Sequence, residues 1–243
     1  MIALPQTAMV LAAGLGTRLR PLTEHTPKPL ITIAGRSLLD HALDRLVEAG
    51  VRHAVVNIHW LGGQIREHLA SRRDIAVTIS DESAELLETG GGIAHALPLL
   101  GDTPFFAVNA DLIWRDHGES ALRRLAAAFD PATMDGLLLL QPRDQATGHA
   151  GPGDFDRGAD GRLVRRGRNP AAAYVYTGVQ LLQPSLFAGA PKGAFSLNLL
   201  YDRAIAAGRL SGLPHQGDWM DVGTHDGIAI AEKILSAGHG GNG

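Results

Sequence analysis

The feature that most constrains this chain is a short apolar run that opens directly into a glycine-rich, cationic loop. The run covers residues 8–13, and its composition is typical of a buried strand. The string LAAGLGTRLRPLTEHTPKPL overlaps the run and continues into two glycines, two arginines, three prolines and a lysine. Its turn-forming residues leave no room for a regular helix before Ser37. A strand that ends in such a loop predicts an α/β fold.

The loop has the chemistry of a phosphate site. Its glycines expose backbone N–H groups, which can approach phosphate oxygens without a side chain in the way. Arg18, Arg20 and Lys28 add the positive charge that a polyphosphate ligand requires, and the prolines stiffen the loop. The G-x-G pair alone is weak, since the loop matches neither the Walker pattern nor the dinucleotide fingerprint. Together these features predict the phosphate end of a nucleotide site formed by Leu11, Ala12, Ala13, Gly14, Gly16 and Thr17.

Length and composition limit the number of domains, the kinds of partner and the location that are expected for this chain. The chain has 243 residues, 45% of them hydrophobic, which is enough for one large α/β domain, expected over 1–237. A net charge of −3 gives no electrostatic case for nucleic acid or an anionic membrane as partner. There is no cysteine, no secretory leader pattern and no run long enough to span a membrane. We therefore expect a cytoplasmic protein with small-molecule substrates.

The order of elements predicts a doubly wound sheet. Ser37 is expected to cap a helix over 37–49 that ends at Gly50. Strands are expected over 52–58 and 75–80, with a helix over about 63–71 between them. The strands are almost wholly apolar, as parallel strands covered on both faces are. The predicted fold is therefore α/β, with three layers around a mostly parallel sheet.

Later segments predict further elements. A helix is expected over 117–129, and the segment 142–170 reads as a glycine-rich hairpin excursion over the sugar site, in which His149 is a solvated loop residue. A strand over 172–182 contains Thr177-Gly178, and a glycine within a strand often marks a close approach. Residues 238–243 are expected to form a disordered tail.

Two carboxylates are the predicted metal ligands. Asp111 follows the apolar strand 105–109, and the carboxyl ends of parallel strands are where such sheets bind ligands. Asp221 stands far away in the sequence, in the string WMDVGT; its metal role is implied by a family resemblance of this string, and a simple helix-entry turn is the alternative interpretation. Carboxylate oxygens suit Mg²⁺, which neutralises phosphate charge in nucleotidyl transfer. The loop and the carboxylates together therefore predict Mg²⁺-dependent transfer to a phosphate nucleophile.

The chain resembles the sugar-1-phosphate nucleotidyltransferases from residue 9 to about residue 234. The resemblance lies in the loop string above and in the strings NIHWLGGQI, LETGGGI, NADLIW and WMDVGT. It implies a GT-A-like fold. Within the family the strings are most similar to the uridylyltransferases of cell-wall recycling, which implies UTP as donor and N-acetylmuramic acid 1-phosphate as acceptor. Mannose-1-phosphate guanylyltransferases share the first motif and are the alternative.

Roles follow for individual residues. Arg18 is expected to hold the departing pyrophosphate, and Lys28 the α-phosphate and the incoming phosphate. The resemblance implies that Glu82 reads the uracil edge, slightly favoured over Glu85, with the backbone N–H groups of Gly90 and Gly91 as donors. The sequence itself predicts a helix over about 93–99, directly after the three glycines. It adds Asn109 to the nucleotide site. The expected sugar-binding residues are Asn57, Asp154, Arg168, Thr177 and Gly178; Arg168 stands near the position where many relatives have Glu-Lys-Pro.

Two other classes of protein are less well supported. A sensor that binds nucleotide sugars without turnover is expected to lack Lys28 or a metal carboxylate, and this chain retains all three. A dinucleotide-dependent oxidoreductase needs a third fingerprint glycine and an acidic residue after the second strand, and both are missing. For the oligomeric state, the sequence leaves both monomer and homodimer open.

Overall fold

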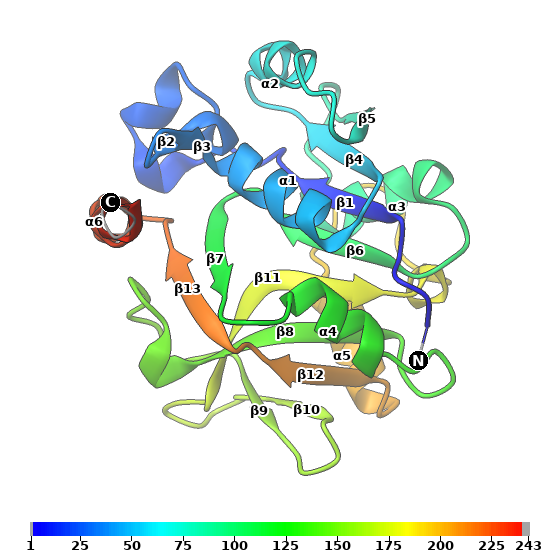
Figure 1. Ribbon diagram of the computed structural model, residues 1–243. Helices are drawn as coiled ribbons and strands as arrows, with labels where there is room; N and C mark the ends of the chain where they lie inside the picture. Colours follow the sequence, from blue (N-terminus) through cyan, green and yellow to red (C-terminus); the bar gives the residue numbers. More distant parts are fainter. Residues whose placement is uncertain (1, 240–243) are drawn as a thin grey trace.

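The fold is organised around one twisted nine-stranded sheet, seen in a computed structural model that describes residues 2–239 (Figure 1). The strands of this sheet, in spatial order along its main path, are β10 (Leu163–Arg165), β9 (Phe155–Arg157), β11 (Tyr174–Leu182), β6 (Phe105–Asn109), β1 (Thr7–Leu11), β4 (His53–Ile58) and β5 (Ala76–Asp81). Two further strands, β8 (Gly136–Pro142) and β12 (Leu210–Pro214), continue it from β11.

The half of the sheet built first along the chain is parallel. β1 pairs in parallel with β4 and β6, and β4 pairs in parallel with β5. Two strands of the sheet run in the opposite direction: β11 is antiparallel to β6, β8 and β9, and β10 is antiparallel to β9. Leu11, Asn57 and Asn109 lie side by side in the register where β1, β4 and β6 end. This common edge is where the glycine-rich loop begins.

Helices cover both faces of the sheet, which confirms the predicted three layers (Figure 1). The helices α1 (Leu38–Ala49), α2 (Gly62–Leu69) and α4 (Ala121–Ala128) pack on one face, and α3 (Glu88–Leu100) and α5 (Asn198–Ala206) on the other. Successive residues of β1 serve both layers, since Val10 packs with α1 and Met9 with α3. No helix among residues 2–239 is long and apolar enough to cross a membrane.

Local signals placed the ends of α1 correctly. The Ser37 hydroxyl accepts a hydrogen bond from the Asp40 N–H at 3.0 Å, which is the geometry of an N-cap. Gly50 ends the helix at φ +102°, in the left-handed region that favours glycine. The predicted start of the helix over 117–129 was wrong by four residues, because 117–120 form a turn and α4 begins at Ala121.

A second, smaller sheet was missed by the sequence analysis. It pairs β7 (Leu112–Asp116) with β13 (Gly217–Asp221) in antiparallel register, with Asp221 opposite Leu112. A two-stranded hairpin, β2 (Thr32–Ile33) with β3 (Arg36–Ser37), and helix α6 (His225–His239) pack beside it in a separate apolar cluster. This unit lies against the glycine-rich loop, since a Cβ on Gly223, just after β13, would lie 3.1 Å from the Arg18 guanidinium.

The remaining connections are short turns and the predicted hairpin. Five 3₁₀ turns are present in the described residues: Thr17–Leu19, Leu22–Glu24, Lys28–Leu30, Arg143–Gln145 and Pro184–Phe187. The hairpin β9–β10 within 142–170 is confirmed, and Phe155 joins it to Tyr174 of β11. Helix α6 runs through His239, so the first two residues of the predicted tail, 238–239, belong to it; residues 240–243 lie outside the described residues.

The buried histidine between β12 and β13 predicts a pH-dependent stability. The His215 side chain is fully buried, and burial lowers its pKa, against the opposing effect of Asp116, 3.9 Å away. In the unfolded chain His215 is protonated as the pH falls through about 6.5, whereas in the folded chain its protonation needs a lower pH. Stability is therefore expected to be lost as pH falls below 6.5. Urea unfolding between about pH 7.5 and about pH 5.5 should show a shallower loss in His215→Gln than in the wild type. His117→Gln serves as control, because His117 is exposed. If the free energy of unfolding of His215→Gln fell with pH as steeply as that of the wild type, His215 would not be the source of the pH dependence.

Candidate active site

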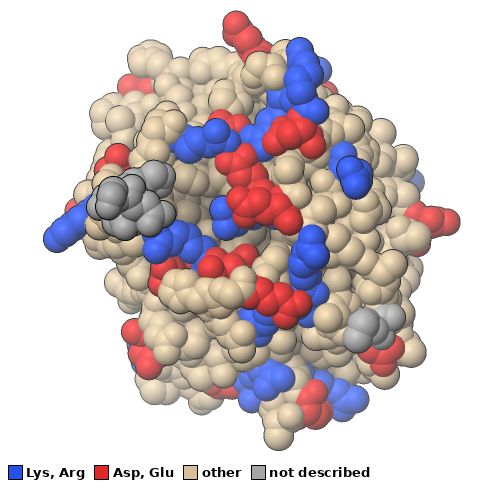
Figure 2. All heavy atoms as spheres, in the orientation of Figure 1, with Lys and Arg blue, Asp and Glu red and all other residues tan. Residues whose placement is uncertain are grey.

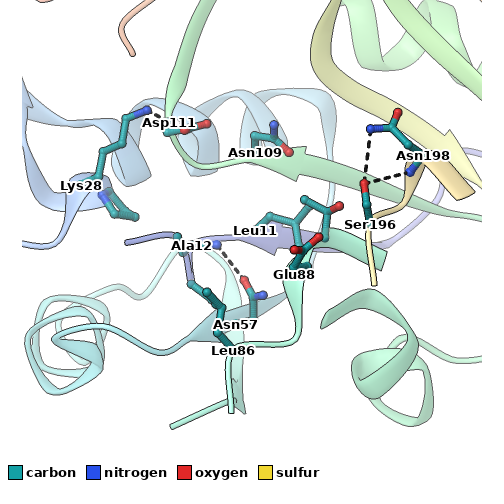
Figure 3. Close-up of a pocket in the computed structure, with 14 residues that line it drawn as sticks. Leu11, Ala12, Lys28, Asn57, Leu86, Glu88, Asn109, Asp111, Ser196 and Asn198 are labelled. Carbon is teal, nitrogen blue, oxygen red and sulfur yellow. Dashed lines mark hydrogen bonds and ion pairs between the residues drawn. The ribbon is translucent and has the colours of Figure 1, made fainter. Parts of the chain in front are cut away.

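A large cavity lies at the carboxyl ends of β1, β4 and β6. It is a cavity of about 400 Å³ lined by Leu11, Ala12, Ala13, Gly14, Lys28, Pro29, Asn57, Leu86, Glu88, Thr89, Asn109, Asp111, Ser196 and Asn198 (Figure 3). In the space-filling view, basic and acidic side chains surround a hollow on the face drawn (Figure 2). Most of the residues predicted for the phosphate loop therefore open onto one cavity.

The glycine-rich loop is folded so that Lys28 reaches this cavity. Gly16 has φ +63°, and a Cβ there would lie 3.0 Å from the Lys28 Cβ and 2.9 Å from the Thr23 Cγ2. The Thr23 hydroxyl donates to the Gly16 carbonyl at 2.8 Å and fastens the same turn. Only glycine combines this backbone conformation with so close an approach. Gly16 thereby packs the start of the loop against Lys28.

The first part of the loop offers free donors. In the part of the chain that the structure describes, the backbone N–H groups of Gly14, Leu15 and Gly16 donate to no protein acceptor. The exposed Arg18 lines an adjoining cavity together with Lys28, Asp111 and Gly223. The arrangement of free N–H groups and two cationic side chains suits an anionic ligand.

Lys28 and Asp111 form a close ion pair. The Lys28 Nζ lies 2.6 Å from the Asp111 Oδ2, and the Lys28 side chain is 9% exposed (Figure 3). The Asp111 side chain remains 39% exposed, so part of the carboxylate still faces the cavity. A buried ammonium needs such a partner, since an unpaired charge there is strongly disfavoured.

The small sheet brings the second predicted carboxylate to the same place. A second cavity, of about 230 Å³, is lined by Arg18, Lys28, Asn109, Asp111, Leu112, His149, Asp154, Val175, Tyr176, Thr177, Gly178, Trp219 and Asp221. Because β13 pairs with β7, Asp221 stands opposite Leu112, the residue that follows Asp111. Asp111 and Asp221, which are 110 positions apart in the sequence, therefore line one cavity.

The donor set at this point fits Mg²⁺. Asp111 and Asp221 supply carboxylate oxygens, and both side chains are partly exposed to the cavity. The Lys28 ammonium already places a positive charge against Asp111, as a cation would. No group of three or more His, Cys, Asp or Glu side chains that could hold a metal occurs among residues 2–239. The remaining ligands would have to be phosphate oxygens and water, as is usual for Mg²⁺.

The glycines of the string LETGGGI have a packing role. Helix α3 begins at Glu88, so Gly90, Gly91 and Gly92 lie within its first turns instead of preceding it. The N–H groups of Gly90 and Gly91 both donate to the Phe195 carbonyl, at 2.9 and 3.1 Å. A Cβ on Gly91 would lie 2.3 Å from the Gly193 carbonyl oxygen. The prediction that Gly90 and Gly91 donate to a base was wrong, because their donors are already used.

Glu82 and Asn57 form a buried bridge beneath the loop. Asn57 Nδ2 donates to Glu82 Oε1 at 2.7 Å, and Asn57 Oδ1 accepts from the Ala12 N–H at 2.7 Å. The other Glu82 oxygen accepts from the Leu87 N–H at 3.2 Å, and the residue is 2% exposed. Glu82 therefore supports the site instead of facing it, and Asn57 lies at the end of β4 by the phosphate loop, away from the predicted sugar residues. The Glu82 oxygens are thus used within the protein, while Asn57 still lines the main cavity.

The predicted sugar residues divide into two groups. Asp154, Thr177 and Gly178 line the second cavity, and the Asp154 carboxylate accepts from the Tyr176 N–H at 2.8 Å. The Trp219 indole N–H donates to the Thr177 carbonyl at 2.9 Å. Arg168 is exposed beyond the hairpin β9–β10, and it lines neither of the two cavities. The predicted contact between Arg168 and the sugar therefore has no counterpart in this arrangement.

Gly178 is a point of close approach, as its place within a strand predicted. It has φ +82° in the bulge of β11, and a Cβ there would lie 2.2 Å from Leu112 Cδ2. We expect Gly178→Ala to lower the free energy of unfolding by about 1–3 kcal/mol, measured by urea denaturation. Gly63→Ala is the control, since no atom lies within 4 Å of its Cβ position and its φ is ordinary. Equal stability of the two variants would contradict this reading of the bulge.

The sequence analysis missed several residues of the site. His149 was expected to be solvated, yet its side chain is 19% exposed and its Nδ1 lies 3.3 Å from Asp221 Oδ2. Leu86, Glu88 and Thr89 line the main cavity, and Glu88 has φ +59°, which is uncommon for a residue with a side chain. Their only sequence signal is their position just before the three glycines. His149 carries no local signal at all, because Asp221 is 72 positions away.

Comparison with known proteins gives the family. The nucleotidyl transferase family matches residues 7–237, which is nearly the whole chain. The chain belongs to this family. It is 45% identical to the N-acetylmuramate alpha-1-phosphate uridylyltransferase of Caulobacter vibrioides over 96% of this chain and 98% of that one. It is 39% identical to the protein of the same name from Neisseria meningitidis serogroup B, over 95% and 98%.

A solved structure agrees in fold. A UDP-glucose pyrophosphorylase complexed with UDP-glucose superposes with a TM-score of 0.79 at 17% identity, over 96% of this chain and 99% of that one. The mostly parallel sheet with its two helical layers is thus the nucleotidyltransferase fold, as the motif strings predicted. The chain is accordingly an enzyme of this family.

Proposed function

We propose that this enzyme transfers a uridylyl group from UTP to N-acetylmuramic acid 1-phosphate, releasing pyrophosphate and forming UDP-N-acetylmuramic acid. The observation that supports this most is the meeting of the phosphate loop, Lys28, Asp111 and Asp221 at one place. The donor and the acceptor come from the two relatives with that activity in their names, which match over almost their full length. The product chemistry suits cell-wall recycling in the cytoplasm.

The proposed roles of the loop follow from its charges. The free N–H groups of residues 14–16 and the guanidinium of Arg18 would hold the β- and γ-phosphates that leave as pyrophosphate. Lys28 would contact the α-phosphate and the incoming sugar phosphate. Both reactants are anions, so these side chains lower their repulsion and align them for in-line attack. The acceptor phosphate is already ionised, and no nucleophilic side chain is required.

Asp111 and Asp221 would hold Mg²⁺. The bound ion would supply charge neutralisation at the α-phosphate. With Asp111 as a ligand of the cation, the Lys28 ammonium would be available to phosphate oxygens.

The proposed base site lies at the start of α3. The N–H groups of Glu88 and Thr89 have no acceptor in the part of the chain that is described, and both residues line the main cavity. Uracil presents two carbonyl acceptors and one N–H donor, so backbone donors at a helix start match part of its edge. We place the base between Leu11–Gly14 and Leu86–Thr89, two positions before the donors that the sequence suggested.

The acceptor is proposed to occupy the second cavity. Thr177 and Gly178 from β11 and Asp154 from the hairpin excursion line it together with Trp219. The cavity adjoins Lys28 and Asp111, so a sugar phosphate there would point its phosphate toward the nucleotide. This arrangement allows direct attack on the α-phosphate without a covalent enzyme intermediate.

Pyrophosphate release tests the proposal. Purified protein with Mg²⁺ is given UTP with N-acetylmuramic acid 1-phosphate, and separately GTP with mannose 1-phosphate. We expect release with the first pair only. Release with the second pair only would overturn the assigned base and sugar but keep the reaction class. Binding of nucleotide without release from either pair would favour a sensor over an enzyme.

A further inference from the structure

We propose that His149 is a positioning residue that fixes the carboxylate of Asp221 for cation binding. The segment Thr147–His149 would act as a clasp that holds the end of β13. The proposal rests on the metal role proposed for Asp221, and it adds a residue that neither the motif strings nor the loop chemistry indicated. Through His149, the glycine-rich excursion would contribute to the part of the site where Asp221 lies.

The backbone of the clasp is joined to β13 by two hydrogen bonds. The Thr147 N–H donates to the Trp219 carbonyl at 3.2 Å, and the Asp221 N–H donates to the Thr147 carbonyl at 2.9 Å. Thr147 thus forms a parallel bridge with Met220 beside the small sheet. The end of β13 is therefore paired on both sides, by β7 and by the clasp.

Gly148 allows the chain to turn at this point. It has φ +75°, and a Cβ there would lie 2.8 Å from the Asp221 carbonyl oxygen. A side chain at 148 would strain the backbone and push the segment away from β13. The turn directs the next residue, His149, back over the Asp221 side chain.

The imidazole is held on one side by Trp219 and faces the carboxylate on the other. The two rings meet edge to face with centroids 6.0 Å apart. His149 Nδ1 lies 3.3 Å from Asp221 Oδ2, and because a carboxylate only accepts, Nδ1 must be the donor in this contact. Asp221 Oδ1 accepts from the Gly223 N–H at 2.9 Å.

The two donors together define the orientation of the Asp221 carboxylate. Among the described residues, Oδ2 of Asp221 has no hydrogen-bond donor other than His149. Removing the imidazole leaves the carboxylate held at Oδ1 alone and free to rotate. Outer donors that orient a metal ligand commonly change metal affinity by about 10–100-fold, which sets the expected size of the effect.

Mn²⁺ binding measured by electron paramagnetic resonance tests this inference without turnover. We expect His149→Ala to weaken Mn²⁺ binding by the protein alone by about tenfold. His149→Asn places an amide N–H close to where Nδ1 stands, so it should stay within about threefold of the wild type. The KM for UTP at saturating Mg²⁺ should change little, because His149 does not line the nucleotide cavity.

His117→Ala is the matched control, since His117 also contacts a carboxylate of β13, that of Asp218, but lies outside both cavities. Equal Mn²⁺ affinity in His149→Ala and wild type would overturn the proposal. So would an equal loss in His149→Ala and His149→Asn, because the donor would then be irrelevant. A wild type that binds no Mn²⁺ would remove it as well, while pyrophosphate release would still report separately on the proposed reaction.

Discussion

Replacing Lys28 by alanine should lower kcat by about 10²–10³-fold and weaken UTP binding far less. The ammonium is 2.6 Å from Asp111 and lines all three cavities of the site, so it lies where the α-phosphate and the incoming phosphate are proposed to meet. Charge that develops between the two phosphates in the transition state is stabilised there. In Lys28→Ala, UTP can still bind to the free loop N–H groups and to Arg18. We therefore expect the affinity for UTP to fall only slightly.

Steady-state kinetics and isothermal titration with UTP separate these two effects. Lys233→Ala on the exposed face of α6 is the matched control, because it removes the same charge away from the cavities. Lys28→Arg should also be impaired, since a planar guanidinium cannot replace the compact ammonium that lies 2.6 Å from Asp111 Oδ2. An unchanged kcat in Lys28→Ala would remove Lys28 from the mechanism.

Replacing Asp221 by asparagine is expected to reduce kcat/KM by about 10³-fold, equivalent to about 4 kcal/mol of transition-state stabilisation. The substitution keeps the volume of the side chain but removes its charge. Its amide nitrogen must also face either the Gly223 N–H or His149 Nδ1, both of which are donors in the present arrangement. Cation binding should therefore weaken together with turnover.

The Mg²⁺ concentration needed for half-maximal rate is the informative measurement, taken alongside kcat/KM. Asp218→Asn is the control on the same strand, because Asp218 pairs with Arg115 and His117 outside both cavities. We prefer Asp221 to Asp111 for this test, since Asp111→Asn also leaves the buried Lys28 without its ion-pair partner. Wild-type kinetics in Asp221→Asn at every Mg²⁺ concentration would show that Asp221 is no metal ligand.

Much of the fold follows from signals that act over a few residues. Ser37 and Gly50 mark the two ends of α1. Both ends can be predicted because N-capping by a serine hydroxyl and the left-handed conformation of glycine are properties of single residues. The apolar strands predicted the sheet, and the glycine-rich loop predicted where phosphates are expected to bind. The position of Asp111 at the end of β6 also follows from sequence, because the loop after a parallel strand always opens at the same edge.

The contacts that complete the site depend on pairings between distant segments. Asp221 reaches Asp111 only because β13 pairs with β7, a short strand with no periodic signal of its own. The Phe195 carbonyl accepts hydrogen bonds from the N–H groups of Gly90 and Gly91. The Glu82 carboxylate, which the motif placed at the base, is buried and hydrogen-bonded to Asn57.

By itself the sequence determined the α/β class and the family, and it predicted the phosphate loop and the two metal carboxylates, because each depends on residue type and short spacing. Only the tertiary structure decided which donors are free and which are used within the protein. It also decided that His149 faces Asp221, since that contact depends on a turn at Gly148 and on pairing with a strand some seventy residues later. Hydrogen-bond partners of this kind are set by three-dimensional packing, which leaves no mark in the local sequence.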